Sequence, residues 1–217
     1  MKKGSLRDAF FNSSVSGFFF RHSEWLSSWP FTIGYAALVA KGGMNPDLDT
    51  VAGLLMMASG AGLALQKKWP SLSFRLSGAL GACAALCLSA KGINFDTMEI
   101  VNGWRFVAPL TGPLIVNTLI AFQKEVAQFS QAHLNSDSGI KRAFARAGQY
   151  PLLASACIDL TNGPNFIMTA ITEHDNVFLG AIGVFAVGDL GLIASDQRLQ
   201  KTHRNYKEGN APAPASP

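Results

Sequence analysis

The stretch Tyr150–Ile171 reads YPLLASACIDLTNGPNFIMTAI, and it raises the question of which solvent this part of the chain meets. Most of its residues are apolar, yet Asp159 lies near its middle and an Asn-Gly-Pro-Asn run follows at residues 162–165. A helix of this length, rising about 1.5 Å per residue, is long enough to cross the roughly 30 Å hydrocarbon core of a bilayer. The stretch therefore predicts a membrane-spanning helix with an unusually polar middle.

Similar apolar blocks recur along the whole chain. Of its 217 residues, 48% are hydrophobic and only 15% are charged, whereas charged residues make up about 25% of an ordinary soluble domain. A soluble helix bundle is the alternative, but its helices would carry charged outer faces, which these blocks lack. We therefore predict an all-α, polytopic transmembrane helix bundle of about six spans. The predicted spans are residues 25–41, 50–66, 74–90, 105–123, 150–172 and 177–195.

The basic residues are distributed unevenly between the segments that join these blocks. Six spans with a cytoplasmic N-terminus place fifteen of the 18 Lys and Arg residues on the inner side and leave only Lys41, Lys91 and Arg105 outside. The outer segments are acidic instead, with Asp47, Asp49, Asp96, Glu99, Glu173 and Asp175. The positive-inside rule predicts this asymmetry. We therefore predict a multi-pass protein of a bacterial inner (plasma) membrane, with both termini in the cytoplasm.

The segments that flank the membrane domain, residues 25–195, have compositions of their own. Residues 1–24 are rich in Phe and are predicted to form a cytoplasmic or interfacial segment. Residues 196–217 are basic at first and end in GNAPAPASP, a low-complexity sequence that predicts disorder. Within the domain, the longest cytoplasmic loop is expected to contain a basic amphipathic helix around Lys141–Ala147.

Signatures of several function classes are missing from the sequence. There is no dense run of Lys and Arg and no nucleic-acid-binding motif, so we predict no nucleic-acid partner. The four histidines lie in predicted loops or termini, and catalytic, phosphate-binding and metal-binding motifs are missing. We therefore predict that the protein is not an enzyme and holds no metal or cofactor. Cys83, Cys87 and Cys157 lie inside spans, where they are expected to pack as small apolar residues.

Small residues recur at the spacing of a helix-packing face. Ser77, Gly81, Ala85 and Ser89 follow one another every four residues in the third span, and Gly180 and Gly188 form a similar pattern in the sixth. Such faces allow the backbones of two helices to approach closely. The structural interpretation is sufficient here, and no ligand is needed to explain the pattern.

The first and last pairs of predicted spans share a sequence pattern. One pair opens on Trp29-Pro30 and the other on Tyr150-Pro151, and both end in a Gly-rich run. A repeat of helix hairpins is one way in which transporters are built. Chance similarity between Gly-rich membrane helices is the alternative.

Three polar side chains are predicted to share one depth in the bundle. Asp159, Asp189 and Asn117 come from the fifth, sixth and fourth spans, and their depths agree to within about 5 Å at the helical rise. A carboxylate at membrane depth costs about 2.5–3.5 kcal/mol on insertion scales, so its default interpretation is functional. The alternative is structural, with each aspartate bonded to a neighbouring polar group.

The Asn-Gly-Pro-Asn run is predicted to interrupt the fifth span. Pro164 removes a backbone hydrogen bond and Gly163 loosens the same turn, so carbonyl groups are freed at membrane depth. Thr161, Asn162 and Asn165 would add hydroxyl and amide groups beside Asp159. The expected result is the wall of a polar cavity, because broken helices at mid-membrane often form substrate and ion sites.

Two functions follow from these features. The first is a carrier of a small polar solute, proton-coupled through Asp159, in which Asn162, Asn165, Asn117 and Thr161 bind the solute. Asp189, Pro164 and Gly163 would then serve as relay or gating residues. The second is a non-catalytic accessory or assembly subunit of a larger membrane complex. The expected partners are the lipid bilayer, the solute or a proton, and either a second copy of the chain or a larger complex.

Overall fold

The computed structural model describes residues 10–11, 13–43 and 47–208, except the side chains of Trp104 and Asn165. Residues 1–9 and the tail from residue 209, which is predicted to be disordered, lie outside the described part. The structure is mostly helical, as predicted. Its helices are α2 (Ser14–Arg21), α3 (Ser23–Leu26), α4 (Trp29–Gly42), α5 (Leu48–Leu63), α6 (Pro70–Ala90), α7 (Gly103–Thr111), α8 (Pro113–Ala121), α9 (Gln123–His133), α10 (Gly139–Ala147), α11 (Pro151–Thr172), α12 (Asn176–Ser195) and α13 (Gln197–Lys207).

Each predicted span contains a helix or, in the fourth span, the consecutive helices α7 and α8. Among the described residues, α6 and α12 are the helices that are long and apolar enough to cross a membrane by themselves. The helices α7, α8 and α9 add a third crossing if they are counted as one span, although α9 is bent by 86° from the column of α7 and α8. The helices α4 and α5 have only 14 and 16 residues. Two apolar helices are therefore compatible with a membrane protein, and the six-span topology stays a prediction.

Several helix starts are encoded by the local sequence. The side chains of Asp47 and Asp175 accept hydrogen bonds from the backbone N–H groups of Thr50 and Phe178, at 2.8 and 2.9 Å. Each carboxylate satisfies an N–H group that has no partner within the helix. Proline occupies the first turn of α4, α6, α8 and α11, where its missing N–H costs nothing.

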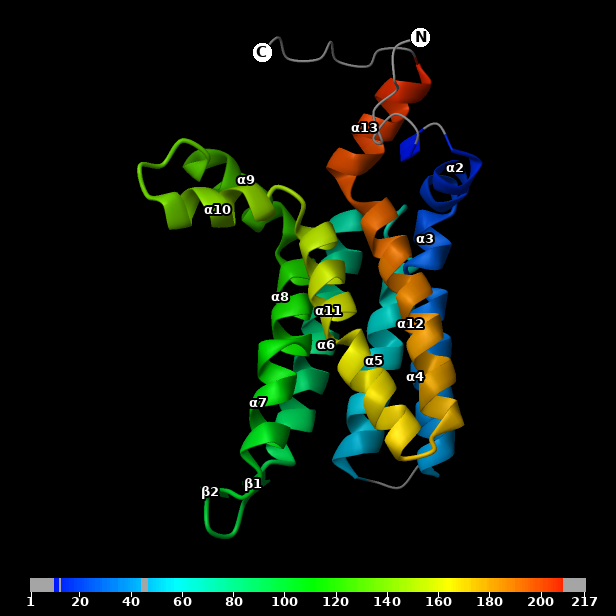
Figure 1. The fold of residues 1–217 in the computed structure, drawn as a ribbon, viewed down its shortest axis with the longest axis vertical. Helices are drawn as coiled ribbons and strands as arrows, with labels where there is room; N and C mark the ends of the chain where they lie inside the picture. Colours follow the sequence, from blue (N-terminus) through cyan, green and yellow to red (C-terminus); the bar gives the residue numbers. More distant parts are fainter. Residues whose placement is uncertain (1–9, 12, 44–46, 209–217) are drawn as a thin grey trace.

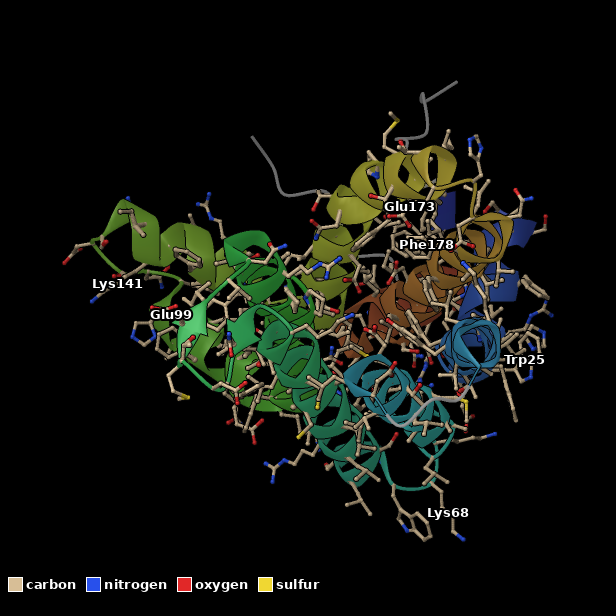
Figure 2. The ribbon with its side chains drawn as sticks, turned by 90° about the horizontal axis from the view of Figure 1, so that it is seen from below. Trp25, Lys68, Glu99, Lys141, Glu173 and Phe178 are labelled. Atoms are coloured by element: carbon tan, nitrogen blue, oxygen red, sulfur yellow. The ribbon has the colours of Figure 1, made fainter. Side chains whose placement is uncertain are left out.

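The long helices form a closed ring (Figure 1; Figure 2 shows it from below). In order, α4 packs on α5, α5 on α6, α6 on α7 and α8, α8 on α11, α11 on α12, and α12 returns to α4. A buried apolar cluster joins five of these helices and contacts Phe31 of α4. Its members are Leu63, Phe74, Val116, Ile120, Leu152 and Leu192. The ring brings the fourth, fifth and sixth predicted spans side by side.

The small residues of α6 pack against three neighbouring helices: Gly81 meets Asn117 of α8, Ser77 lies beside Gly62 of α5, and Ser89 donates a hydrogen bond to the carbonyl oxygen of Phe106 in α7. Ser77, Gly81, Ala85 and Ser89 are all buried, which confirms the predicted packing face. A Cβ atom on Gly78 would overlap the backbone of Asn117 and Ala121. On α12 the pattern holds only in part, because Gly188 meets the ring of Phe31 whereas Gly180 faces open space.

The N-terminal aromatic residues pack on the C-terminal helix. The ring of Phe20 stacks on His203 with centroids 4.3 Å apart, and the ring of Phe11 stacks on Tyr206 at 5.2 Å. His203 is buried, and its Nδ1 atom has no hydrogen-bond partner among the described residues. Burial lowers the pKa of His203 below its ordinary value of 6.5, and the charge of Lys207 acts in the same direction.

Replacement of Gly78 by alanine should destabilise the bundle. The new methyl group would push against backbone atoms of α8 that cannot rotate away, and such overpacking costs about 1–3 kcal/mol. The midpoint of thermal unfolding in detergent should therefore fall. Gly180→Ala is the matched control, because nothing lies within 4 Å of its added Cβ and its midpoint should not fall. An equal fall of the unfolding midpoint in Gly78→Ala and Gly180→Ala would contradict this account of the α6–α8 contact.

The packing of α2 on α13 should weaken in mild acid. Because the pKa of His203 is lower in the folded protein than in the unfolded chain, its contribution to stability is complete above about pH 6.5 and is lost as the pH falls below that value. The measurement is the unfolding midpoint between pH 8 and pH 5 for the natural protein and for His203→Phe, which keeps a stacked ring without a titrating group. Identical pH profiles for the two proteins would show that His203 is not responsible.

Candidate functional site

Two aspartates from adjacent helices face the same region of the bundle. Asp159 on α11 and Asp189 on α12 are close enough for the charge of one to act on the other. Asp189 is only 4% exposed, and its Oδ1 atom has no hydrogen-bond partner among the described residues. Asp159 is partly buried. The packing of α11 on α12 therefore brings together an acidic pair (Asp159 and Asp189) in which Asp189 is buried and Asp159 is partly buried.

Tyr35 of α4 completes this region. Its ring packs on Phe185 with centroids 4.6 Å apart, and both aspartates act electrostatically on its hydroxyl group. The sequence reasoning missed Tyr35 because a tyrosine inside an apolar block is usually read as a packing residue. One signal was present: of the three tyrosines, only Tyr35 lies well inside a predicted span. It supplies a hydroxyl that can donate or accept a hydrogen bond.

The acidic pair has a definite chemical capacity. Two carboxylates that are poorly hydrated and near each other repel when both are charged. A proton, a cation or the hydrogen-bond donors of a solute would relieve this repulsion. Neither aspartate forms an ion pair among the described residues, whose ion pairs join Lys41 to Asp175, Arg75 to Glu125, and Lys91 to Asp49.

Asn162 lies where α11 passes the junction of α7 and α8. Its Nδ2 atom donates to the carbonyl oxygen of Ile158 at 2.9 Å, and it would lie 3.3 Å from a Cβ atom on Gly112. Gly112 is the residue that separates α7 from α8. The polar run of α11 is therefore next to the interruption of the neighbouring helix column, one turn from Asp159.

The expected interruption at Pro164 does not occur. The helix α11 is continuous from Pro151 to Thr172 with Pro164 inside it. Proline keeps a helical φ angle, so it removes one hydrogen bond without ending the helix. The hydroxyl of Thr161 donates to the carbonyl of Ile158 at 2.7 Å. The interruption in this region falls at Gly112 instead.

The other predicted site residues lie apart from the acidic pair. Thr161 and Pro164 are exposed on the outside of α11, and a Cβ atom on Gly163 would meet nothing within 4 Å. The side chain of Asn165 lies outside the described part of the structure. Asn117 turns toward α6: its Nδ2 atom donates to the carbonyl of Pro113 at 2.7 Å, and its Oδ1 atom occupies the space beside Gly81. The amide of Asn117 is thus engaged with its own helix and with α6, and the third polar side chain within electrostatic reach of the two aspartates is Tyr35.

An open hollow lies at the end of the bundle where α11 connects to α12. It measures about 270 Å³ and is lined by Lys41 and by residues 173–177, which connect α11 to α12. Lys41 pairs with Asp175 there. The same two helices therefore carry the acidic pair within the bundle and a charged hollow at its end.

Comparison with known proteins identifies no relative: no family model, no curated protein and no solved structure matches the chain. Within the described residues, no group of three or more His, Cys, Asp or Glu side chains could hold a metal ion. The acidic pair has only two such side chains, and it is better suited to a proton, a monovalent cation or a hydrogen-bonding solute than to a resident transition metal.

Neutralising Asp189 should not destabilise the protein. A buried carboxylate with one oxygen that lacks a hydrogen-bond partner is costly, so Asp189→Asn should leave the free energy of unfolding unchanged or raise it. Asp47→Ala is the contrasting variant, because it removes a helix cap and should cost about 1 kcal/mol. Thermal unfolding in detergent compares the two. If Asp189→Asn lowers the midpoint as much as Asp47→Ala, Asp189 serves the fold rather than a site.

Proposed function

We propose that this protein is a multi-pass carrier of a small polar solute, with six spans and both termini in the cytoplasm, in a bacterial inner membrane. In this proposal Asp159 binds a proton or the cationic group of the solute, and Asp189 relays the charge. Tyr35 and Asn162 donate hydrogen bonds to the solute. Asn117 is left out of the binding set because its amide contacts Pro113 and α6.

The observation that carries the proposal is the acidic pair itself. Asp189 is buried with an unsatisfied oxygen, and a second carboxylate lies near it on the adjacent helix. A fold gains no stability from such a pair, because desolvation and repulsion both oppose it. Ionisable groups of this kind within a membrane usually belong to ion or substrate pathways. The nearby interruption at Gly112 supports the same function, since carriers use discontinuous helices at their sites.

A second function is favoured by a different surface. The loop between α6 and α7 forms a hairpin of β1 (Ile93–Asn94) and β2 (Glu99–Ile100), which projects from the end of the bundle (Figure 1). Phe95 and Met98 at its tip are 61% and 76% exposed. Exposed apolar patches often mark contact with a partner. An accessory or assembly subunit of a larger membrane complex would use the hairpin in this way.

Loss of the Asp159 charge should abolish transport if the first function is correct. Purified protein is reconstituted into liposomes that contain a pH-sensitive dye, and pools of amino acids, sugars and organic acids are added outside. The natural protein should produce solute-dependent proton movement, and Asp159→Asn should be slower by about tenfold or more, as expected for a group that binds the transported charge. Asp96→Asn, an exposed change in the hairpin, is the control and should transport normally.

The two functions are separated by gentle extraction from the native host followed by mass spectrometry of the co-purifying proteins. Isolation alone or as a homo-oligomer supports the carrier. Stoichiometric companions, together with normal behaviour of Asp159→Asn in the host, would overturn it and favour the accessory subunit.

A further inference from the structure

A helical arm leaves the bundle at a right angle. The helix α9 is bent by 86° from the column of α7 and α8, and α10 folds back on it. We call residues 123–147 the α9–α10 arm; Figure 1 shows it projecting sideways from one end of the bundle. Its two helices pack tightly, since Ala145 is fully buried and a Cβ atom on Gly148 would overlap Ser130 Oγ. The existence of a basic helix here was predicted, and α10 confirms it.

The root of the arm is fixed to the bundle. Glu125 of α9 pairs with Arg75 of α6, and Lys124 donates a hydrogen bond to Ser71. Because the arm is nearly perpendicular to α7 and α8, it runs parallel to the membrane plane if those helices cross the bilayer. It leaves from the lysine- and arginine-rich end of the bundle, which the charge distribution assigns to the cytoplasm.

The helix α10 carries an exposed apolar face, a buried position at Ala145, and two basic side chains that flank that position, Lys141 on one side and Arg146 on the other. Ile140 and Phe144, four residues apart, form an apolar face and are 71% and 72% exposed. Ala145 faces α9. Lys141 and Arg146 are exposed, and among the described residues their side chains have no hydrogen-bond or ion-pair partner. Figure 2 shows Lys141 near the end of the arm that is farthest from the bundle.

The helix α9 and its start add apolar area to the arm. Phe129 is 59% exposed and stacks on His133, and Phe122, at the bend, is 51% exposed. The acidic side chains of the arm are few: Glu125 is already paired with Arg75, and Asp137 lies in the turn between the helices. Arg142 is occupied with the carbonyl oxygens of Ser136 and Asp137, so it holds the turn in place.

We propose that the α9–α10 arm lies in the headgroup layer of the cytoplasmic leaflet and binds anionic phospholipids. Ile140, Phe144 and Phe129 enter the boundary of the acyl chains, and Lys141 and Arg146 contact lipid phosphates. Exposed aromatic and aliphatic side chains next to unpaired basic groups, on a helix parallel to the membrane, match the chemistry of such a surface. The proposal rests on the membrane location but not on transport.

The test places an environment-sensitive fluorophore on the arm of the full-length protein. Cys83, Cys87 and Cys157, which are free, are replaced by alanine, and Phe144→Cys is labelled with bimane. The protein is reconstituted into vesicles of phosphatidylcholine alone or of phosphatidylcholine mixed with anionic phosphatidylglycerol, which attracts basic segments. Brominated acyl chains quench the label. Quenching should be stronger with phosphatidylglycerol.

Charge variants separate lipid recognition from general attraction. Each basic group near an anionic surface raises the binding constant about fivefold. The double variant Lys141→Gln with Arg146→Gln should therefore lower the ratio of membrane-bound to unbound α9–α10 arm by roughly 25-fold. The matched control, Lys201→Gln with Arg204→Gln on α13, removes the same charge from another exposed basic helix and should change nothing. The proposal would be overturned if quenching were the same with and without phosphatidylglycerol and were unchanged by the Lys141→Gln and Arg146→Gln substitutions.

A second label distinguishes failure of this proposal from failure of the membrane location. Leu190→Cys places the fluorophore on an exposed position of α12, which should be quenched in either lipid mixture. If the label at 190 is quenched and the label at 144 is not, the arm faces solvent or a partner protein and the proposal is wrong. If neither is quenched, the membrane location itself is wrong, and the arm proposal fails with it.

Discussion

The close approach of α8 to α6 is the contact on which the remaining arrangement depends. It requires glycine at positions 78 and 81, because the backbone of α8 and the amide of Asn117 occupy the space of their missing side chains. This contact places the column of α7 and α8 beside α11, so that Gly112 meets Asn162. It also brings the start of α9 to Arg75, which fixes the root of the α9–α10 arm. Dispersion contacts between closely spaced backbones, rather than burial from water, hold such helices together in a membrane.

The ring closes through a second set of small residues. Gly34 of α4 leaves room for Phe185, and Gly188 of α12 leaves room for Phe31. These contacts draw α12 against α4 and bring Tyr35 to the acidic pair. This close packing of α12 on α4 thus lies next to a carboxylate oxygen that has no hydrogen-bond partner among the described residues.

Local sequence rules predicted the features that depend on one segment alone. They failed for side chains whose direction depends on a neighbouring helix. Helix positions followed from apolar blocks and from prolines in first turns, and the face of α6 followed from its four-residue spacing. Asn117 matched the depth of the aspartates, but depth does not determine direction, and its amide turned to its own helix and to α6. Pro164 was expected to interrupt α11, yet proline is compatible with a helical φ, and α11 continues through it.

The sequence by itself determined that the chain is helical, where its helices lie, which of its faces can pack closely and which end is basic, because these properties depend on spacing and composition along one segment. Only the tertiary structure decided that Asp159, Asp189 and Tyr35 come within electrostatic reach of one another, that Gly112 faces Asn162, and that α9 leaves the bundle at 86°. The physical reason is that these features depend on how helices rotate about their axes and bend between segments. The mutual fit of side chains from three or more helices sets that rotation, and no single segment encodes it.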